Sequence, residues 1–223
     1  MTQPTAHASD SAIEQTWRQL VATARRTAAE GLVVGTSGNV SARVGPLILV
    51  TPSGVPYDRL TDRDVTAVDL DGRRVLGTLE PTSELPLHLA VHRTREVGAV
   101  VHTHAAHATA VSVLVDELPP VHYMTADLGG PVRVAPYAVY GSEELAAHML
   151  TALDGRRACL LGNHGTVAVG ETPDQAYDRT AQLEWMCRVW LLASSVPGLA
   201  PRLLTPEQLA EAGTRLRGYG QPG

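Results

Sequence analysis

The chain has 223 residues, a formal net charge of −5 and 44% hydrophobic residues. That length fits one domain with a sizeable core, and the absence of a basic block argues against nucleic acid as a partner. No apolar run approaches the roughly 20 residues that span a bilayer, so no membrane partner is expected. Cys159 and Cys187 lie in apolar contexts and are interpreted as buried thiols, which fits a reducing cytoplasm.

All 18 residues counted as lysine or arginine are arginines. A chain without lysine has no Schiff-base lysine, no pyridoxal-phosphate lysine and no P-loop lysine. Any carbonyl chemistry must therefore be carried by a metal ion or a carboxylate.

Hydrophobic spacing organises the chain into alternating helices and strands. Residues 1–11 are polar and are expected to form a flexible extension, and Ser11 with Glu14 suggests a capping box for the first helix. Helices interleaved with strands over 12–223 predict a single domain of the α/β (α+β) class. The predicted elements are a helix at 11–30, a small-residue loop at 35–43 leading into a strand, strands at 47–51 and 65–70 with a hairpin turn at 71–72, a helix opening at 81–84, a strand at 97–104, a helix at 107–115, strands at 158–161 and 166–169, and helices at 172–193 and 206–217.

Three histidines each end an apolar strand. His102 and His104 are two residues apart, so their side chains point to the same face of the strand and make half of a metal site. His164 follows a second apolar run, and three imidazoles completed by a carboxylate or water form a zinc-type ligand set. The remaining histidines of predicted helices, His88, His92 and His148, are interpreted as solvated or incidental.

Glu84 is the carboxylate candidate, because it stands at the start of a predicted helix. Pattern alone favours an acid that complements the helix dipole, and a base or displaceable metal ligand remains the functional alternative. Three loops, Gly38-Asn39, Ser53-Gly54 and Thr82-Ser83, offer backbone N–H groups and small hydroxyls that suit a phosphate dianion, although each loop alone is better explained as ordinary turn chemistry.

Six segments taken together are far more specific than any one motif. They are Gly-Thr-Ser-Gly-Asn-Val-Ser (35–41), Leu-Val-Thr-Pro-Ser-Gly-Val-Pro-Tyr (49–57), Pro-Thr-Ser-Glu (81–84), Ala-Val-Val-His-Thr-His-Ala (99–105), His-Tyr-Met (122–124) and Asn-His-Gly (163–165). In order and spacing they resemble the class II aldolase/adducin-like family, over about residues 12–220, and within it the branch that acts on L-fuculose 1-phosphate. The resemblance implies a central, mostly antiparallel sheet flanked by helices.

The resemblance also implies roles for individual residues. His102, His104 and His164 match ligands of one Zn²⁺ per subunit, for which Co²⁺ or Mn²⁺ could substitute, and Glu84 matches the carboxylate that completes the metal shell at rest and acts as catalytic acid/base. The phosphate and hydroxyketone pocket is matched by Gly38, Asn39, Ser53, Gly54, Thr82 and Ser83, a proton donor from a neighbouring subunit by Tyr123, and a second tyrosine on a mobile C-terminal tail by Tyr219. Tyr140 stands on the aldehyde side, where the resembling enzymes typically have phenylalanine. A cytoplasmic C4 homotetramer with active sites between subunits is implied.

The implied reaction is reversible cleavage of a ketose 1-phosphate, either L-fuculose 1-phosphate or a related 5-deoxy-ketose 1-phosphate, to dihydroxyacetone phosphate and a small aldehyde such as L-lactaldehyde. Pentulose-5-phosphate 4-epimerases share the expected fold and metal triad but typically carry Asp at the position of Glu84. A sugar-phosphate dehydratase or decarboxylase of the same superfamily is a second alternative that the sequence discriminates poorly. A non-catalytic adducin-like domain is disfavoured, because all three histidines and Glu84 are present.

Overall fold

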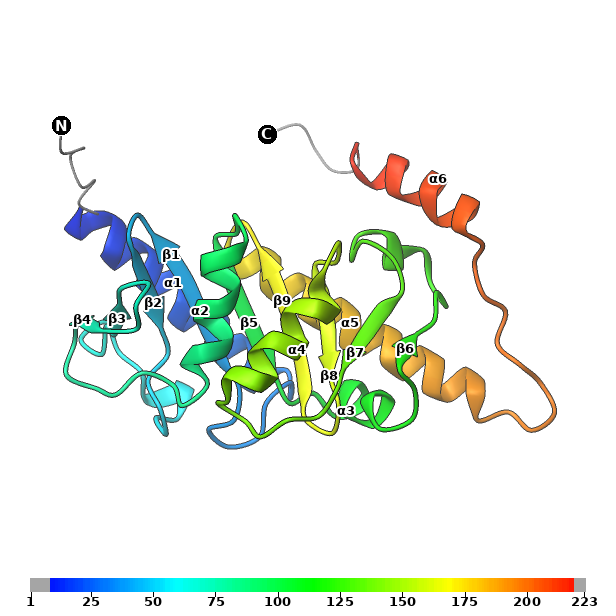
Figure 1. Ribbon diagram of the computed structural model, residues 1–223, viewed down its shortest axis with the longest axis horizontal. Helices are drawn as coiled ribbons and strands as arrows, with labels where there is room; N and C mark the ends of the chain where they lie inside the picture. Colours follow the sequence, from blue (N-terminus) through cyan, green and yellow to red (C-terminus); the bar gives the residue numbers. More distant parts are fainter. Residues whose placement is uncertain (1–8, 219–223) are drawn as a thin grey trace.

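The computed structural model describes residues 9–218 and contains one nine-stranded sheet covered by helices (Figure 1). The strand order is β4-β3-β2-β1-β5-β9-β8-β7-β6, and every pairing is antiparallel except that of β7 with β8. The strands are β1 (Asn39–Val44), β2 (Leu47–Val50), β3 (Ala67–Val68), β4 (Arg74–Leu76), β5 (Ala99–Thr103), β6 (Glu117–Leu118), β7 (Val132–Ala135), β8 (Ala158–Leu161) and β9 (Gly165–Gly170).

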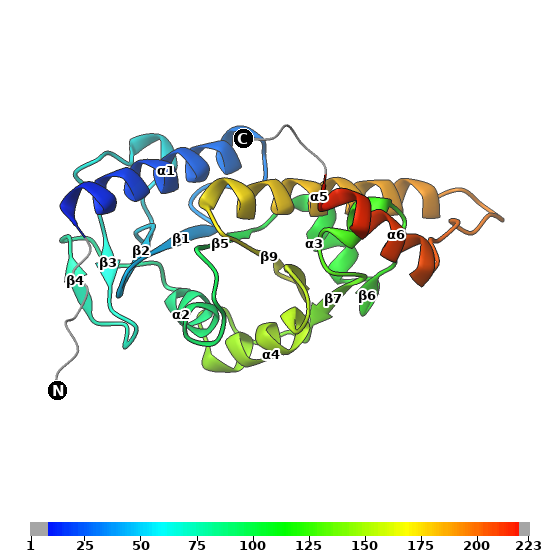
Figure 2. The same cartoon turned by 90° about the horizontal axis from the view of Figure 1, so that it is seen from above.

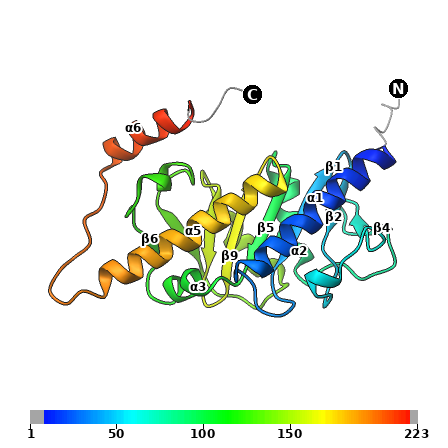
Figure 3. The same ribbon diagram turned by 180° about the vertical axis from the view of Figure 1, so that it is seen from behind.

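Helices cover both faces of this sheet. Seen from above, α1 and α5 run along one face and α2 and α4 along the other, and the reverse view shows α1 and α5 crossing in front of the strands (Figures 2 and 3). The last helix, α6, stands off the sheet and packs on the 3₁₀ turn η2 (Tyr123–Ala126). The helices are α1 (Asp10–Ala29), α2 (Leu85–Thr94), α3 (Ala106–Ser112), α4 (Glu143–Leu153), α5 (Pro173–Ser194) and α6 (Pro206–Leu216), and a further 3₁₀ turn, η1, spans Tyr57–Arg59.

Strand β5 is buried throughout, and its alternation decides where the histidine pair points. Val101 belongs to the core cluster that includes residues of α1 and α5, whereas Val100 belongs to the cluster that includes residues of α2 and α4. Because side chains alternate along a strand, His102 shares the face of Val100. The pair is thereby directed towards α2, whose N-cap residue is Glu84.

The predicted mostly antiparallel sheet flanked by helices is confirmed, with differences at element ends. Ser9 rather than Ser11 caps α1, accepting a hydrogen bond from the backbone N–H of Ala12. The predicted strand at 65–70 is reduced to the two residues of β3, and the predicted helix at 107–115 ends at Ser112. Strands β6 and β7 were not predicted, since two to four residues carry too little periodicity.

Helix α4 was foreseen only through the placement of His148, although Ser142 followed by two glutamates is a start signal. Within residues 9–218, no helix combines the length and the apolarity needed to cross a bilayer.

Candidate metal centre and active-site pocket

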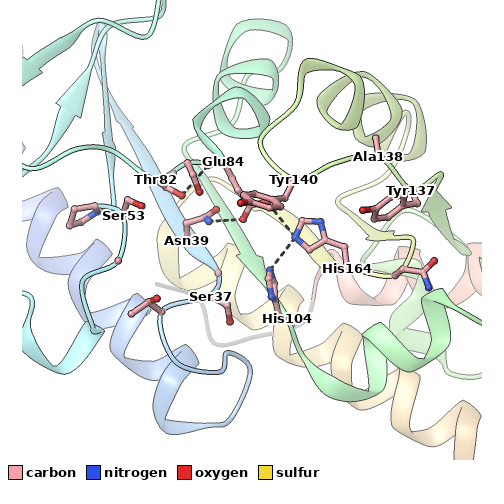
Figure 4. A pocket seen from close by; sticks show the side chains of 16 residues that line it. Ser37, Asn39, Ser53, Thr82, Glu84, His104, Tyr137, Ala138, Tyr140 and His164 are labelled. Atoms are coloured by element: carbon pink, nitrogen blue, oxygen red, sulfur yellow. Dashed lines mark hydrogen bonds and ion pairs between the residues drawn. The ribbon is translucent and has the colours of Figure 1, made fainter.

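The three strand-end histidines and Glu84 meet at one point. His102 and His104 come from β5 and the residue after it, His164 from the turn between β8 and β9, and Glu84 from the start of α2. The Nε2 atom of His104 lies 3.0 Å from that of His102 and 3.1 Å from that of His164. The carboxylate of Glu84 spans the other two imidazoles, with Oε2 3.0 Å from Nε2 of His102 and Oε1 3.3 Å from Nε2 of His164. Figure 4 shows Glu84, His104 and His164 converging from three elements.

The protonation of His102 follows from its backbone partner. Its Nδ1 atom lies 2.8 Å from the carbonyl oxygen of Thr166, which can only accept, so Nδ1 carries the proton. In the neutral ring the Nε2 lone pair then faces the Glu84 carboxylate. Two acceptors at contact distance repel each other unless a second ring proton or a metal ion lies between them.

Burial keeps the other two imidazoles neutral. It lowers the pKa of His104 to about 4 and that of His164 to about 4, and the proximity of His102 lowers both further. For Glu84, burial raises the pKa, but the charge and hydrogen bond of a doubly protonated His102 and the hydrogen bond from Asn39 outweigh it and hold the pKa well below its usual range. A metal ion in place of that second ring proton favours the ionised carboxylate in the same way. Neutral imidazoles and an ionised carboxylate are the protonation states that a metal ion requires of its ligands.

The cluster fits a single divalent ion. All four ligand atoms lie within 4.8 Å of one another, a spacing compatible with metal–ligand bonds of about 2 Å. Oε1 of Glu84 is buried and makes no hydrogen bond within the described part of the chain. A buried carboxylate oxygen without a donor carries a large free-energy cost, which a bound cation removes. The nitrogen-rich donor set suits zinc, while oxygen-preferring ions such as Mg²⁺ suit it poorly.

A cavity of about 390 Å³ opens beside this cluster. The predicted phosphate loops meet there although they come from three separate segments of the chain. At Gly38, φ is +80° and an added Cβ would lie 2.9 Å from the carbonyl oxygen of His102, so only glycine fits. Ten of the predicted site residues line the cavity, namely Gly38, Asn39, Ser53, Gly54, Thr82, Ser83, Glu84, His104, Tyr140 and His164.

Further residues of the cavity wall were not predicted. Tyr137 lies beside Tyr140 on the segment between β7 and α4, and both rings are more than half exposed. Asn163 adopts φ +56° in the turn that presents His164. Ser37 lies next to the predicted glycine loop. The sequence carried a signal for each of them, because they adjoin residues or motifs already singled out.

The tyrosine predicted as proton donor does not line this cavity within its own chain. Tyr123 begins η2, is half exposed and borders a different cavity, against Gln208 and Arg215 of α6. Its ring packs at 4.4 Å, centroid to centroid, on His122. Tyr219 lies outside the described residues. The roles predicted for both tyrosines therefore stay predictions.

The interpretation of His88 and His92 as solvated or incidental is wrong. Both are buried between α2 and the sheet, and both hydrogen-bond to the hydroxyl of Ser41, at 2.7 Å and 2.9 Å respectively. His88 Nε2 also lies 2.5 Å from Oδ1 of Asn39, whose Nδ2 donates to Glu84 over 2.9 Å. The signal was the i, i+4, i+8 spacing of Glu84, His88 and His92, which places all three on one helix face.

The fold and the site together define a single-sheet α/β protein with a candidate mononuclear metal centre beside a polar cavity. The family model described as "Class II Aldolase and Adducin N-terminal domain" matches residues 18–191, and the chain belongs to this family.

Relatives agree with this assignment along nearly the whole chain. L-fuculose phosphate aldolase of Escherichia coli (strain K12) is 37% identical over 205 residues, covering 91% of this chain and 94% of the relative. A 5-deoxy-D-ribulose 1-phosphate aldolase of Bacillus thuringiensis serovar kurstaki is 34% identical over 206 residues, covering 91% and 96%. A solved structure of an L-fuculose 1-phosphate aldolase superposes with a TM-score of 0.88 at 32% identity, covering 95% of this chain and 99% of that one.

Proposed function

We propose that the protein is a zinc-dependent aldolase that reversibly cleaves a ketose 1-phosphate to dihydroxyacetone phosphate and a small aldehyde. The observation that carries the proposal is the meeting of the His102, His104, His164 and Glu84 ligand atoms beside a cavity lined with glycines and small hydroxyls. The proposal includes one ion per subunit, a cytoplasmic location and a C4 homotetramer. The unpaired, buried thiols Cys159 and Cys187 are consistent with a reducing compartment.

A divalent ion in this cluster supplies Lewis acidity, which stabilises the negative charge that develops on the ketose oxygens when the carbon–carbon bond breaks. Glu84 transfers the proton to and from the hydroxyketone carbon. Oε2 accepts from Asn39, so Oε1 is the oxygen that would complete the metal shell at rest and would take the proton once substrate oxygens replace it there. Glu84 is buried, which keeps bulk water away from that oxygen.

The phosphate of the substrate is assigned to the loops that carry Ser53, Gly54, Thr82 and Ser83. These residues line the cavity on the side that adjoins the N-terminus of α2, where backbone N–H groups and the helix dipole favour an anion. Since the chain has no lysine, binding relies on neutral donors. Because these donors are uncharged, they do not repel a metal ion bound close by, as a lysine ammonium would.

Tyr123 is assigned to proton donation at the aldehyde oxygen, from a neighbouring subunit. Its position outside the cavity of its own chain supports that arrangement, because an exposed tyrosine remote from one site is free to complete another. Tyr140 is assigned to the aldehyde side of the cavity and Tyr219 to the C-terminal closure. L-Fuculose 1-phosphate and 5-deoxy-ketose 1-phosphates are the candidate substrates, from the activities named for the two relatives.

The test is to couple dihydroxyacetone phosphate with a panel of aldehydes and to read the products by NMR. We expect lactaldehyde or acetaldehyde to give a ketose 1-phosphate with one defined stereochemistry at both new centres. The same spectra separate the alternatives. Interconversion of two pentulose 5-phosphates without free dihydroxyacetone phosphate identifies an epimerase, and loss of water or carbon dioxide identifies a dehydratase or decarboxylase.

A further inference from the structure

A buried chain of hydrogen bonds runs from Glu84 beneath α2 to His92. It passes from the Glu84 carboxylate to the Asn39 amide, from there to the His88 ring, then to the Ser41 hydroxyl and finally to the His92 ring. All five side chains belong to residues that are at most 5% exposed. The phosphate role predicted for Asn39 leaves this chain unexplained, because both ends of its amide are engaged with protein.

The direction of every hydrogen bond in this chain follows from its first member. A carboxylate only accepts, so Nδ2 of Asn39 faces Glu84 and Oδ1 of Asn39 faces His88. His88 must then donate from Nε2, which leaves Nδ1 to accept from the Ser41 hydroxyl. Ser41 has given its only proton, so it accepts from Nε2 of His92. Each bond therefore points its donor towards Glu84.

Both rings can occupy the neutral form that this direction needs. Burial lowers the pKa of His88 to about 3, with the neighbouring His92 and His102 adding to the effect, and lowers the pKa of His92 to about 4, with Arg43 adding to it. Arg43 also donates to the backbone carbonyl of His92, which ties the far end of the chain to β1. Aligned hydrogen bonds polarise one another, so the Asn39 amide becomes a better donor than an isolated one.

We propose that Ser41, His88 and His92 are positioning residues, which hold the Asn39 amide in one orientation and through it fix the Glu84 carboxylate. The inference rests on the proposed function of Glu84. With Oε2 held by Asn39, Oε1 keeps a fixed position between the metal cluster and the cavity. Without this chain of hydrogen bonds, the Asn39 amide can flip and place its oxygen against the Glu84 carboxylate. The repulsion between the two oxygens then displaces Glu84.

Neutron diffraction from crystals of the zinc-loaded protein tests the direction of the chain without any assay. We expect deuterium on Nε2 of His88 and Nε2 of His92, and the Ser41 deuteron directed at Nδ1 of His88. Deuterium on Nδ1 of His88 would overturn the proposal, because His88 could not then donate to Asn39 in its neutral form. This measurement is independent of whether the aldolase activity is found.

Ser41→Ala tests the consequence, since it removes the hydroxyl that fixes the proton position of the His88 ring without substituting His88, Asn39 or Glu84. We expect kcat of the cleavage reaction to fall about 10-fold to 100-fold, the usual effect of losing a partner behind a ligand, while KM changes less than about 3-fold. Ser41→Thr restores a hydroxyl and is expected to recover most of kcat. Zinc content is expected to stay near one per chain in both variants.

Thr180→Val is the matched control. Thr180 is fully buried in α5, on the sheet face opposite to α2 (Figure 2), and its hydroxyl donates to the carbonyl of Ala176 in the same helix. It is expected to lose thermal stability with kcat unchanged, which separates a general loss of packing from loss of positioning. If Ser41→Ala folds, binds zinc and keeps kcat within about 2-fold, the positioning role is refuted. A wild-type protein without aldolase activity would instead refute the proposed function.

Discussion

The Nε2 atom of His102 lies 3.0 Å from Oε2 of Glu84, while the Nδ1 atom of the same ring donates its proton to the Thr166 carbonyl. In a neutral ring a lone pair would face the carboxylate inside the protein, so either a second ring proton or a metal ion must lie between them. Repulsion between that lone pair and the carboxylate makes the cluster with neutral imidazoles unfavourable on its own and favourable around a cation. The same relationship predicts that metal binding and protein stability are linked, because an ion bound only by the folded state stabilises it.

Removing one imidazole should remove the metal. His104→Ala is expected to lower bound zinc from about one per chain to under about 0.1 after dialysis against a competing chelator that leaves the wild-type site loaded, since the loss of one of four ligands weakens the site. Zinc is measured by inductively coupled plasma mass spectrometry. His148→Ala is the control, because His148 lies half-buried on α4, outside the metal cluster, and its ring contacts the Pro136 carbonyl. Full zinc retention by the His104 variant would contradict the assignment.

Glu84→Gln should separate metal binding from proton transfer. The amide keeps the shape of the carboxylate, and three histidines remain to hold the ion, so zinc is expected to stay bound. Exchange of the hydroxyketone proton of dihydroxyacetone phosphate into D₂O, followed by NMR, is expected to slow by about 10²-fold to 10⁴-fold. Exchange at the wild-type rate would remove Glu84 from the acid/base role.

Tyr140 should influence which aldehyde is accepted. The ring lines the cavity and is 67% exposed, so its truncation enlarges the wall on one side. Tyr140→Ala is expected to shift the ratio of kcat/KM between lactaldehyde and acetaldehyde by about 10-fold, the scale at which a pocket discriminates one small group. Tyr140→Phe keeps the ring and isolates the hydroxyl. An unchanged ratio in the alanine variant would show that the aldehyde binds elsewhere.

Glu184 should stabilise the start of α3. Its carboxylate accepts from the backbone N–H groups of His107 and Ala108, and lies 2.6 Å from Nδ1 of His107. Glu184→Ala is expected to lower the free energy of unfolding by about 3 kcal/mol, because partly buried donors lose a charged acceptor. The control is Glu211→Ala, which removes an exposed ion pair with Arg215 and is expected to cost about 0.5 kcal/mol or less. Equal urea midpoints for the two variants would contradict the capping role.

The metal cluster was within reach of sequence reasoning because it depends on local geometry. Residues two apart on a strand share a face, and His102 and His104 ended an apolar run, so their convergence followed from periodicity. Glu84 was placed correctly at a helix start, but only the packing of α2 on the sheet brings it to His102.

Periodicity predicts neither the buried hydrogen-bond chain from Glu84 to His92 nor the position of Tyr123. A histidine within a helix has no burial signature of its own, so the sequence predicts solvated positions for His88 and His92, whereas both are buried. Their burial depends on how α2 rotates against β1, which is a tertiary relationship. Tyr123 borders a separate cavity against α6 of its own chain, a tertiary position that strand and helix periodicity do not encode.

The central claim is that aldol cleavage here requires an ion held by His102, His104, His164 and Glu84. The most direct test measures release of dihydroxyacetone phosphate from L-fuculose 1-phosphate and from a 5-deoxy-ketose 1-phosphate, before and after the protein is stripped with EDTA. We predict that cleavage of the accepted substrate disappears on stripping and returns in proportion to added Zn²⁺, reaching its maximum at about one ion per chain. Full cleavage by protein that holds less than about 0.1 zinc per chain, with no other metal present, would contradict the claim.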